Sequence, residues 1–161
     1  MLTLQGNEKY DGQWKADQRS GHGTYVFANK DKYEGDWLLN KKSGKGVYTF
    51  ANGNKYDGNW LNGLQHRKGT ITHSNSSKYE GDWEAGKKHG KGTYIYHDGS
   101  KYEGEWVKGN MEGRGTYIYE KGEKYNGEWL ADKRHGNGLI TYSDKSFYDG
   151  EWVNDEPINL V

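Results

Sequence analysis

Aromatic and small residues alternate with polar residues at seven evenly spaced places along this chain. The pattern Tyr-x-Gly-x-Trp recurs, and each copy begins 23 residues after the previous one. The seven copies begin at Tyr10, Tyr33, Tyr56, Tyr79, Tyr102, Tyr125 and Tyr148, and end at Trp14, Trp37, Trp60, Trp83, Trp106, Trp129 and Trp152. Alternation with a period of two predicts a half-buried strand. The constant spacing predicts similar units that stack on one another.

The rest of each unit predicts a second strand. Numbering each unit from its tyrosine, position 8 is Asp, Asn or Gly in every copy, which indicates a turn with positive φ. Positions 12 and 14 are mostly glycine, and positions 16 and 18 are apolar or aromatic, as in Tyr48 and Phe50. Positions 20 and 21 include Asn52-Gly53 and Asp98-Gly99, pairs that favour a type I′ turn. We hypothesise that the glycines leave hollows in which neighbouring rings lie.

These elements predict an all-β protein. Each unit forms a β-hairpin, and a tight turn leads to the next, so we expect an elongated single-sheet antiparallel ribbon of about fourteen short strands. Leu2 and Leu4 occupy positions 16 and 18, and the chain ends on the first half of a unit. We therefore expect one array over residues 1–161, with a half-repeat at each end. The sequence leaves open whether the chain is part of a larger protein.

Composition supports a thin, aromatic-rich structure. Hydrophobic residues make up 31% of the chain and aromatic residues 15%, and the mean hydropathy is −1.25. Such a chain has too few aliphatic residues for a thick core, whereas its aromatic content argues against disorder. There is no cysteine, signal peptide or long apolar segment in the sequence. We expect a cytoplasmic protein.

Opposite charges balance overall but are separated along each unit. The chain has 23 basic and 23 acidic residues. Acidic residues predominate at positions 2 and 4, which we expect on the face opposite the aromatic rings. Basic residues gather at positions 9, 10 and 13, around the turn after the first strand, and we expect lysines at position 23 to neutralise part of the acidic row. Because an acidic face lies so near, the pattern argues against nucleic acid as a partner.

The unit resembles the MORN repeat. Residues Tyr79 to Trp106 carry the resemblance with Tyr79-Glu80-Gly81-Asp82-Trp83, Gly86, His89-Gly90-Lys91-Gly92, Asp98-Gly99 and Tyr102-Glu103-Gly104-Glu105-Trp106. The resemblance extends over essentially the whole chain. The third unit departs from it, with Arg67 at the first glycine of Gly-x-Gly, Ile71 at a tyrosine position and His73 at the second aromatic position. A degenerate repeat is the simpler interpretation of these departures, and a local kink or a specific contact is the alternative.

The resemblance implies an attachment module whose aromatic groove binds a partner, in a cytoskeletal or ciliary setting or peripherally at a membrane. In MORN proteins that are enzymes, the chemistry lies in a different domain, so we expect no catalytic activity, cofactor or metal here. Histidines at position 11, His66, His89 and His135, lie at least two strand spacings apart, about 10 Å, which is too far for a shared metal ion. The acidic residues recur as a row and do not converge as a catalytic pair.

Two binding hypotheses follow. In the first, the protein is a scaffold whose aromatic groove binds a helical or extended segment of a protein partner. The groove residues are Tyr33, Trp37, Tyr56, Trp60, Tyr79, Trp83, Tyr102, Trp106, Tyr125 and Trp129. In the second, a basic edge binds phosphoinositides or other anionic lipids. Its residues are Lys41, Lys42, Lys45, Lys87, Lys88, Lys91, Arg114, Lys133 and Arg134. Unpaired terminal strands also suggest end-to-end homo-association.

Overall fold

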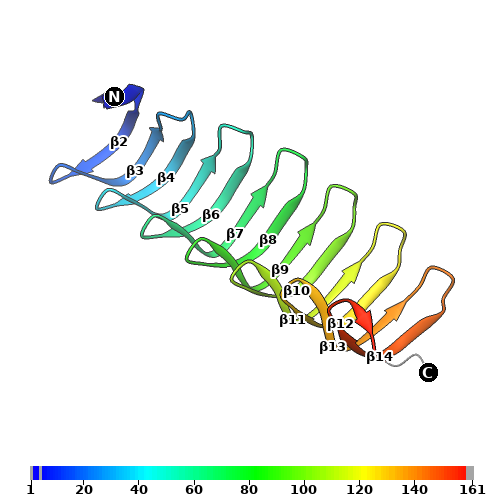
Figure 1. The fold of residues 1–161 in the computed structure, drawn as a ribbon. Coiled ribbons are helices and arrows are strands. Elements are labelled where there is room, and N and C mark those ends of the chain that lie inside the picture. The colour runs from blue at the N-terminus through cyan, green and yellow to red at the C-terminus, as the bar shows by residue number, and fades with distance from the viewer. Residues whose placement is uncertain (1, 4, 159–161) are drawn as a thin grey trace. The chain divides into compact units, whose positions relative to one another are not determined.

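A computed structural model describes residues 2–3 and 5–158, and these residues form one open antiparallel sheet whose strands follow chain order (Figure 1). The first strand of each repeat has seven residues: β2 (Lys9–Lys15), β4 (Lys32–Leu38), β6 (Lys55–Leu61), β8 (Lys78–Glu84), β10 (Lys101–Val107), β12 (Lys124–Leu130) and β14 (Phe147–Val153). The second has nine: β3 (Gln18–Val26), β5 (Lys41–Thr49), β7 (Leu64–Thr72), β9 (Lys87–Ile95), β11 (Asn110–Ile118) and β13 (Lys133–Thr141). Two-residue strands β1 (Leu2–Thr3) and β15 (Glu156–Pro157) and the 3₁₀ turn η1 (Gln5–Asn7) complete the described elements. The predicted all-β single sheet of hairpins is confirmed. The predicted contribution of Leu4 lies outside the described residues.

The chain divides into two compact units. The first comprises residues up to Ser76 together with Trp83–Gly86, and the second comprises Ser77–Asp82 and the residues from Lys87 onward. Within the first unit, β1 to β7 pair in order, each antiparallel to the next. Within the second unit, β9 to β15 do the same. Each unit therefore repeats one local arrangement.

The two kinds of turn differ from the sequence prediction in one respect. Positions 7 and 8 both have positive φ, for example 48° at Leu39 and 67° at Asn40, so the two-residue loop inside each repeat is the type I′ turn. Position 8 carries Asn, Asp or Gly because these residues tolerate that conformation best. The assignment of a type I′ turn to positions 20 and 21 was wrong. There only position 21 has positive φ, such as 93° at Gly53, whose amide donates to the Phe50 carbonyl, as in a type I turn followed by a left-handed residue.

Glycine is required where two strands of one repeat approach a tyrosine ring. Gly35 and Gly46 face each other across β4 and β5. A Cβ on Gly46 would lie 2.2 Å from the Tyr33 hydroxyl oxygen, so only glycine leaves room for the ring. The predicted hollow therefore exists at position 14, and the ring that fills it comes from position 1 of the same repeat.

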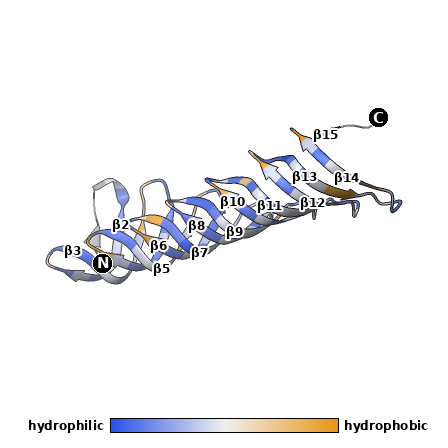
Figure 2. Ribbon diagram, turned by 90° about the horizontal axis from the view of Figure 1, so that it is seen from below, coloured by the Kyte–Doolittle hydropathy of each residue, from blue (hydrophilic) through white to orange (hydrophobic). Residues whose placement is uncertain are grey.

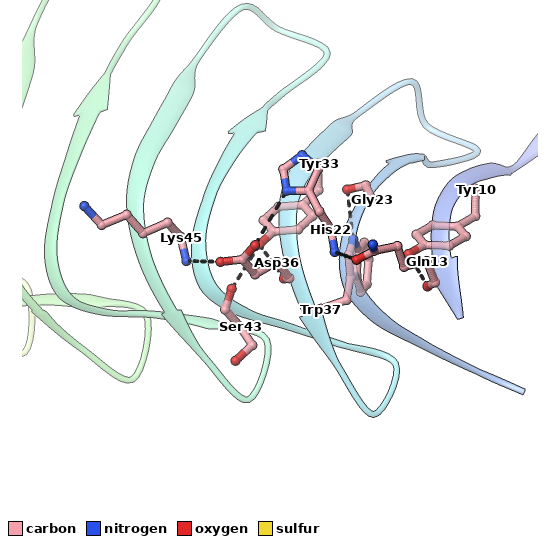
Figure 3. A network of polar contacts seen from close by, with 9 residues as sticks. All are labelled: Tyr10, Gln13, His22, Gly23, Tyr33, Asp36, Trp37, Ser43 and Lys45. Atoms are coloured by element: carbon pink, nitrogen blue, oxygen red, sulfur yellow. Dashed lines mark hydrogen bonds and ion pairs between the residues drawn. The ribbon is translucent and has the colours of Figure 1, made fainter. Parts of the chain in front are cut away.

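The first glycine of Gly-x-Gly has a different role. Gly44 has a φ of 56° and lies next to a bulge, where the register of β4 and β5 shifts. The bulge frees the backbone amide of Lys45, which donates to the Asp36 carboxylate at 3.2 Å (Figure 3). Equivalent bonds join Lys91 to Asp82 and Asn137 to Glu128. The acidic row at position 4 thus satisfies a backbone donor.

The core consists almost entirely of the recurring aromatic rings. Tyr33, Tyr56, Tyr79 and Tyr102 are 0% exposed, and Trp106 is 2% exposed. Figure 2 shows the strands mainly in hydrophilic and intermediate colours, with the hydrophobic colour confined to short stretches. In β4 the exposed and buried residues alternate strictly, which confirms that positions 2 and 4 face away from the rings. We call the two sides of each unit the ring face (positions 1, 5, 10, 16 and 18) and the charged face (positions 2, 4, 13 and 23).

Candidate functional site

On the ring face, tyrosines of position 1 and tryptophans of position 5 form a continuous edge-to-face ladder within each unit. In the first unit, Trp37 lies against Tyr33 of its own repeat at 5.1 Å and against Tyr10 of the preceding repeat at 5.6 Å. In the second unit, Trp129 contacts Tyr125 at 5.2 Å and Tyr102 at 5.3 Å. Interplanar angles of 84–88° place ring edges against ring faces. Each pair contributes about 0.5–1.5 kcal/mol beyond its buried area.

Hydrogen bonds fix the same rings in place. The indole Nε1 of each tryptophan from Trp37 to Trp152 donates to the carbonyl of the position-14 glycine in the preceding repeat, at 3.0–3.1 Å. Each position-1 tyrosine hydroxyl donates to the carbonyl of position 4 in its own repeat, as Tyr33 does to Asp36 (Figure 3). Burial raises the pKa of five of these hydroxyls, those of Tyr10, Tyr33, Tyr56, Tyr102 and Tyr125, for Tyr125 to about 12 even though nearby Arg134 opposes the shift. The rings therefore have few free polar atoms for a ligand.

The structure places the predicted groove residues in the core. The five tyrosines Tyr33, Tyr56, Tyr79, Tyr102 and Tyr125 are 0% exposed, and the five tryptophans Trp37, Trp60, Trp83, Trp106 and Trp129 are at most 7% exposed. Each is covered by its neighbours in the ladder. A partner on this face would meet other residues first. The binding role of these ten residues stays a prediction.

Apart from Trp14 and Tyr148 in the end repeats, the accessible rings of this face belong to positions 16 and 18. Tyr48 and Phe50 lie 4.6 Å apart, and Phe27 of the preceding repeat lies 5.6 Å from Tyr48. In the second unit, Tyr94 and Tyr96 lie 4.4 Å apart. All five are partly exposed. The sequence prediction assigned these residues to a strand and not to the aromatic groove. Their alternation with a period of two from position 14 nevertheless already placed them on the ring face.

Position-16 tyrosines also join consecutive repeats. The Tyr48 hydroxyl donates to the Asp31 carboxylate at 2.6 Å, and the Ala51 amide donates to the other oxygen of that carboxylate at 2.8 Å. Burial of Tyr48 and its bond to Asp31 raise the pKa of the hydroxyl. In the second unit, the Tyr94 hydroxyl contacts Ser77 Oγ at 3.3 Å. These bonds hold the ring row in a fixed orientation.

Basic residues at position 10 lie over these rings. The Lys42 Nζ atom is 4.5 Å from the Tyr48 centroid and 4.6 Å from the Trp60 centroid. Lys88 Nζ is 4.3 Å from the Trp106 centroid. Arg19 and Arg134 occupy the same position in their repeats, with Arg19 Cζ 4.6 Å from Trp37 and Arg134 Cζ 4.4 Å from Trp152. Cation–π contacts of this geometry contribute about 0.5–2 kcal/mol.

The nine residues of the predicted basic edge therefore lie in three places. Lys42, Lys88 and Arg134 at position 10 lie on the ring face and are partly buried. Position 13 is paired with position 4 of the next repeat, which puts Lys45, Lys91 and Arg114 on the charged face. Lys41, Lys87 and Lys133 at position 9 are exposed beside the type I′ turns. Six of the nine are exposed, and their lipid-binding role stays a prediction.

The charged face carries short ion pairs. Lysines at position 23 contact the glutamate two residues later, with Nζ to carboxylate distances of 3.1 Å for Lys32–Glu34, 3.2 Å for Lys78–Glu80 and 3.1 Å for Lys101–Glu103. The predicted neutralisation of the acidic row is thus present, at about 0–1 kcal/mol for each exposed pair. In the first unit, a shallow hollow of about 540 Å³ on this face is lined by both acidic and basic residues, including Lys45 and Asp57. His22 contacts Asp36 at 3.5 Å nearby (Figure 3).

Metal binding needs several His, Asp or Glu side chains close together. Among residues 2–3 and 5–158, no three His, Asp or Glu side chains gather closely enough to hold a metal ion. The Nδ1 atom of His135 is buried, and no described residue bonds it. Nor does the described part of the chain contain a helix of the length and apolarity that a membrane crossing requires.

The chain is similar to several solved structures and matches one family model. No curated protein matches the sequence. The TCP domain of SAS-4 from Drosophila melanogaster, solved with a proline-rich motif of Ana2, is 11% identical over 80% of this chain and 71% of that chain, with a TM-score of 0.49. The TCP10c domain of Sas-4 from the same organism is 10% identical over 91% and 87%, with a TM-score of 0.49. The TCP10 domain of CPAP from Danio rerio, in complex with a STIL peptide, is 11% identical over 82% and 84%, with a TM-score of 0.21.

The family model for the MORN repeat matches the chain seven times in succession. The matches cover residues 10–32, 33–55, 56–78, 79–101, 102–124, 125–147 and 148–157. Their boundaries coincide with the 23-residue period that begins at each Tyr-x-Gly-x-Trp. The matched segments also contain the rings, glycines and turns that build the two units. Because the seven matches account for nearly all of the sequence, the chain belongs to the MORN-repeat family.

Proposed function

We propose that the protein is a non-enzymatic scaffold that binds a segment of a protein partner along its ring face. In this proposal residues 1–161 form a single MORN array with a half-repeat at each end, which acts in a cytoskeletal or ciliary assembly. The partner segment is extended or helical. The observation that carries the proposal is the row of partly exposed rings at positions 16 and 18, which rests on a Tyr–Trp ladder that is buried from Tyr33 to Trp129.

Two properties of this row support protein binding. Tyr and Phe offer a large contact area and lose little side-chain entropy on binding, because each has only two rotatable side-chain bonds. The rings are also held before any partner arrives, by the bond from Tyr48 to Asp31 and by ring pairs at 4.4–4.6 Å. A surface that is already ordered has a smaller entropic cost of association.

Tyrosine hydroxyls add directional donors in the second unit. Tyr96 and Tyr119 at position 18 are partly exposed, and no described residue bonds either hydroxyl. Their neighbours Ile95 and Ile118 point to the opposite face and are 42% and 39% exposed. Tyr96 and Tyr119 therefore lie on the ring face, and their sequence neighbours Ile95 and Ile118 lie on the opposite face. The same substitution can be made in both pairs to compare the two faces.

The test compares partner binding after serine substitutions on the ring face and on the opposite face. Partners are purified from the native cell with the intact protein, identified by mass spectrometry, and then titrated as purified proteins against the variants. Tyr96→Ser with Tyr119→Ser should weaken binding at least tenfold, whereas Ile95→Ser with Ile118→Ser should change it less than about threefold, since hot-spot aromatic residues contribute about 2 kcal/mol or more. Circular dichroism checks that both variants stay folded. Equal losses from both faces would refute the ring face as the binding surface.

The alternative function is peripheral binding to anionic membranes. It is favoured by the exposed cations at positions 9 and 13, because each cation near such a surface adds about 1 kcal/mol. Co-sedimentation with vesicles that contain a phosphoinositide should then fall steeply with salt and be abolished by Lys87→Glu with Lys91→Glu. Binding that is unaffected by these changes would exclude the lipid alternative.

A further inference from the structure

The four basic residues at position 10 differ in what their charged groups contact. Arg19 donates from Nε to Asn40 Oδ1 at 3.3 Å and from an Nη atom to the Asn40 carbonyl at 3.2 Å. Arg134 makes the same pair of bonds to Asp155, and its Nε lies 3.4 Å from the carboxylate. In both cases the acceptor is the position-8 residue of the next repeat. These two guanidinium groups are satisfied within the protein.

The two lysines have no such acceptor. The position-8 residue of the next repeat is Gly63 for Lys42 and Gly109 for Lys88, and glycine has no side chain to accept a bond. The backbone contact between the turns is kept, since the Gly63 amide donates to the Lys42 carbonyl and the Gly109 amide to the Lys88 carbonyl. Among the described residues, neither ammonium forms an ion pair or a hydrogen bond.

Nearby acids do not replace the missing acceptor. Asp31 is the acid whose charge acts on Lys42, but its carboxylate is already bonded by Tyr48, Asn29 and Ala51. Asp132 is the corresponding acid for Lys88, and its Oδ1 accepts the Met111 amide. Burial lowers the pKa of both lysines, because the charged form loses water on the ring face. Each lysine is a half-desolvated cation with three donors and no protein acceptor.

We propose that Lys42 and Lys88 select a partner segment that is acidic. A carboxylate of the segment accepts a hydrogen bond from each ammonium it reaches, while apolar side chains of the segment lie on the rings of positions 16 and 18. This inference rests on the proposed function, because it specifies what the ring face binds. The occupant is chosen by charge complementarity, since a carboxylate supplies the acceptor that Asn40 and Asp155 supply to the arginines.

A membrane is the less suitable occupant of these two lysines. Both ammonium groups lie over rings on the face of the sheet, whereas Lys41 and Lys87 beside them are exposed at the turns. A broad lipid surface would meet the protruding lysines first. Within either unit, an extended acidic chain can lie on the rings and reach the lysine of that unit, Lys42 in the first or Lys88 in the second.

The experiment is a selection of random linear peptides, displayed on phage, against the intact protein. Glu and Asp should be enriched among the selected peptides. A selected peptide is then titrated against Lys42→Gln and Lys88→Gln. Each substitution should weaken binding about tenfold when the peptide bonds that lysine, because one charge-assisted hydrogen bond is lost. Gln is a suitable replacement because Gln65 occupies position 10 in the third repeat. The matched controls Lys41→Gln and Lys87→Gln remove the same charge one residue away and should cost less than about threefold.

Replacement of Gly63 or Gly109 by Asp gives an independent test that keeps both lysines. Asp tolerates the positive φ of this position, as Asp155 and Asp132 show. It would give the ammonium an acceptor inside the protein, so binding of the acidic peptide should fall about tenfold.

The outcomes separate the inference from the function on which it rests. If no peptide binds the ring face, the proposed function fails, and the inference fails with it. If the selected peptides bind there but lack acidic residues, or if the position-9 controls weaken binding as much as the position-10 variants, only the inference is overturned. Displacement of the peptide by phosphatidylserine vesicles, but not by phosphatidylcholine vesicles, would overturn it in favour of a lipid ligand.

Discussion

Substitution of Gly115 by alanine tests the packing on which the repeat depends. Gly115 occupies position 14 in β11, and a Cβ there would lie 2.3 Å from the Tyr102 hydroxyl oxygen and 2.5 Å from two ring carbons. The Tyr102 ring cannot move away, because it is 0% exposed and lies between Trp106 at 5.1 Å and Trp129 at 5.3 Å. Gly115 has no positive φ, so the effect is steric and not a matter of backbone strain.

The expected cost lies at the upper end of the range for overpacked cores, about 3 kcal/mol. In a chain of this length a loss of that size lowers Tm by roughly 6–12 °C. Thermal unfolding followed by circular dichroism measures the shift, and hydrogen exchange across β10 and β11 locates it. The matched control is Gly122→Ala, at a turn where a Cβ meets nothing within 4 Å but φ is +88°. That variant should cost about 1–2 kcal/mol from backbone strain alone.

A double-mutant cycle identifies the cause of the loss. If the clash with the tyrosine ring is responsible, Gly115→Ala should cost less by about 1–3 kcal/mol when Tyr102→Leu has removed the ring end. The control Gly122→Ala should cost the same in both backgrounds. A penalty for Gly115→Ala below about 1 kcal/mol, or one unchanged by Tyr102→Leu, would refute the reasoning.

Three further predictions concern the same elements. Trp106→Phe removes the indole bond to the Gly92 carbonyl and should lower the unfolding free energy by about 1–3 kcal/mol, whereas Trp14→Phe, at a ring that is 45% exposed, should cost less than about 1 kcal/mol in urea titrations. Arg67→Gly should stabilise the third repeat by about 0.5–1 kcal/mol, because Arg67 holds a φ of 57° at a position that is glycine in five other repeats; a lower Tm for this variant would contradict this backbone strain. Burial raises the pKa of Tyr33, Tyr56 and Tyr102, and that of Tyr125 to about 12. The contribution of these tyrosines to the free energy of unfolding is therefore complete below pH 10 and is lost as pH rises toward and through their pKa values in the folded protein. Tyrosinate absorbance should therefore rise together with unfolding, and independent ionisation of these tyrosines in the folded protein near their ordinary pKa would disprove their burial.

The sequence by itself determined the repeat, its strands and the direction in which each side chain points. A 23-residue period with alternation of two needs no tertiary information, because the pleat sends successive side chains to opposite faces. Position 8 was identified as a turn for an equally local reason, the tolerance of Asn, Asp and Gly for positive φ. The same alternation separates position 10 from position 13, so the split of the predicted basic edge between two faces was already implicit in the sequence.

Only the tertiary structure decided which rings are accessible. Tyr102 and Trp106 appear in the sequence as a candidate groove, but each is covered by a ring of an adjacent repeat, and that contact depends on how two hairpins pack. The turn types were also settled beyond the local sequence, since Asn-Gly pairs fit more than one loop geometry and strand pairing selects between them. The difference between Arg134, which bonds Asp155, and Lys88, which faces Gly109, arises from residues 21 positions apart that only stacking brings together. Local preferences act within a strand or a turn, whereas burial and the supply of acceptors depend on the neighbouring repeat.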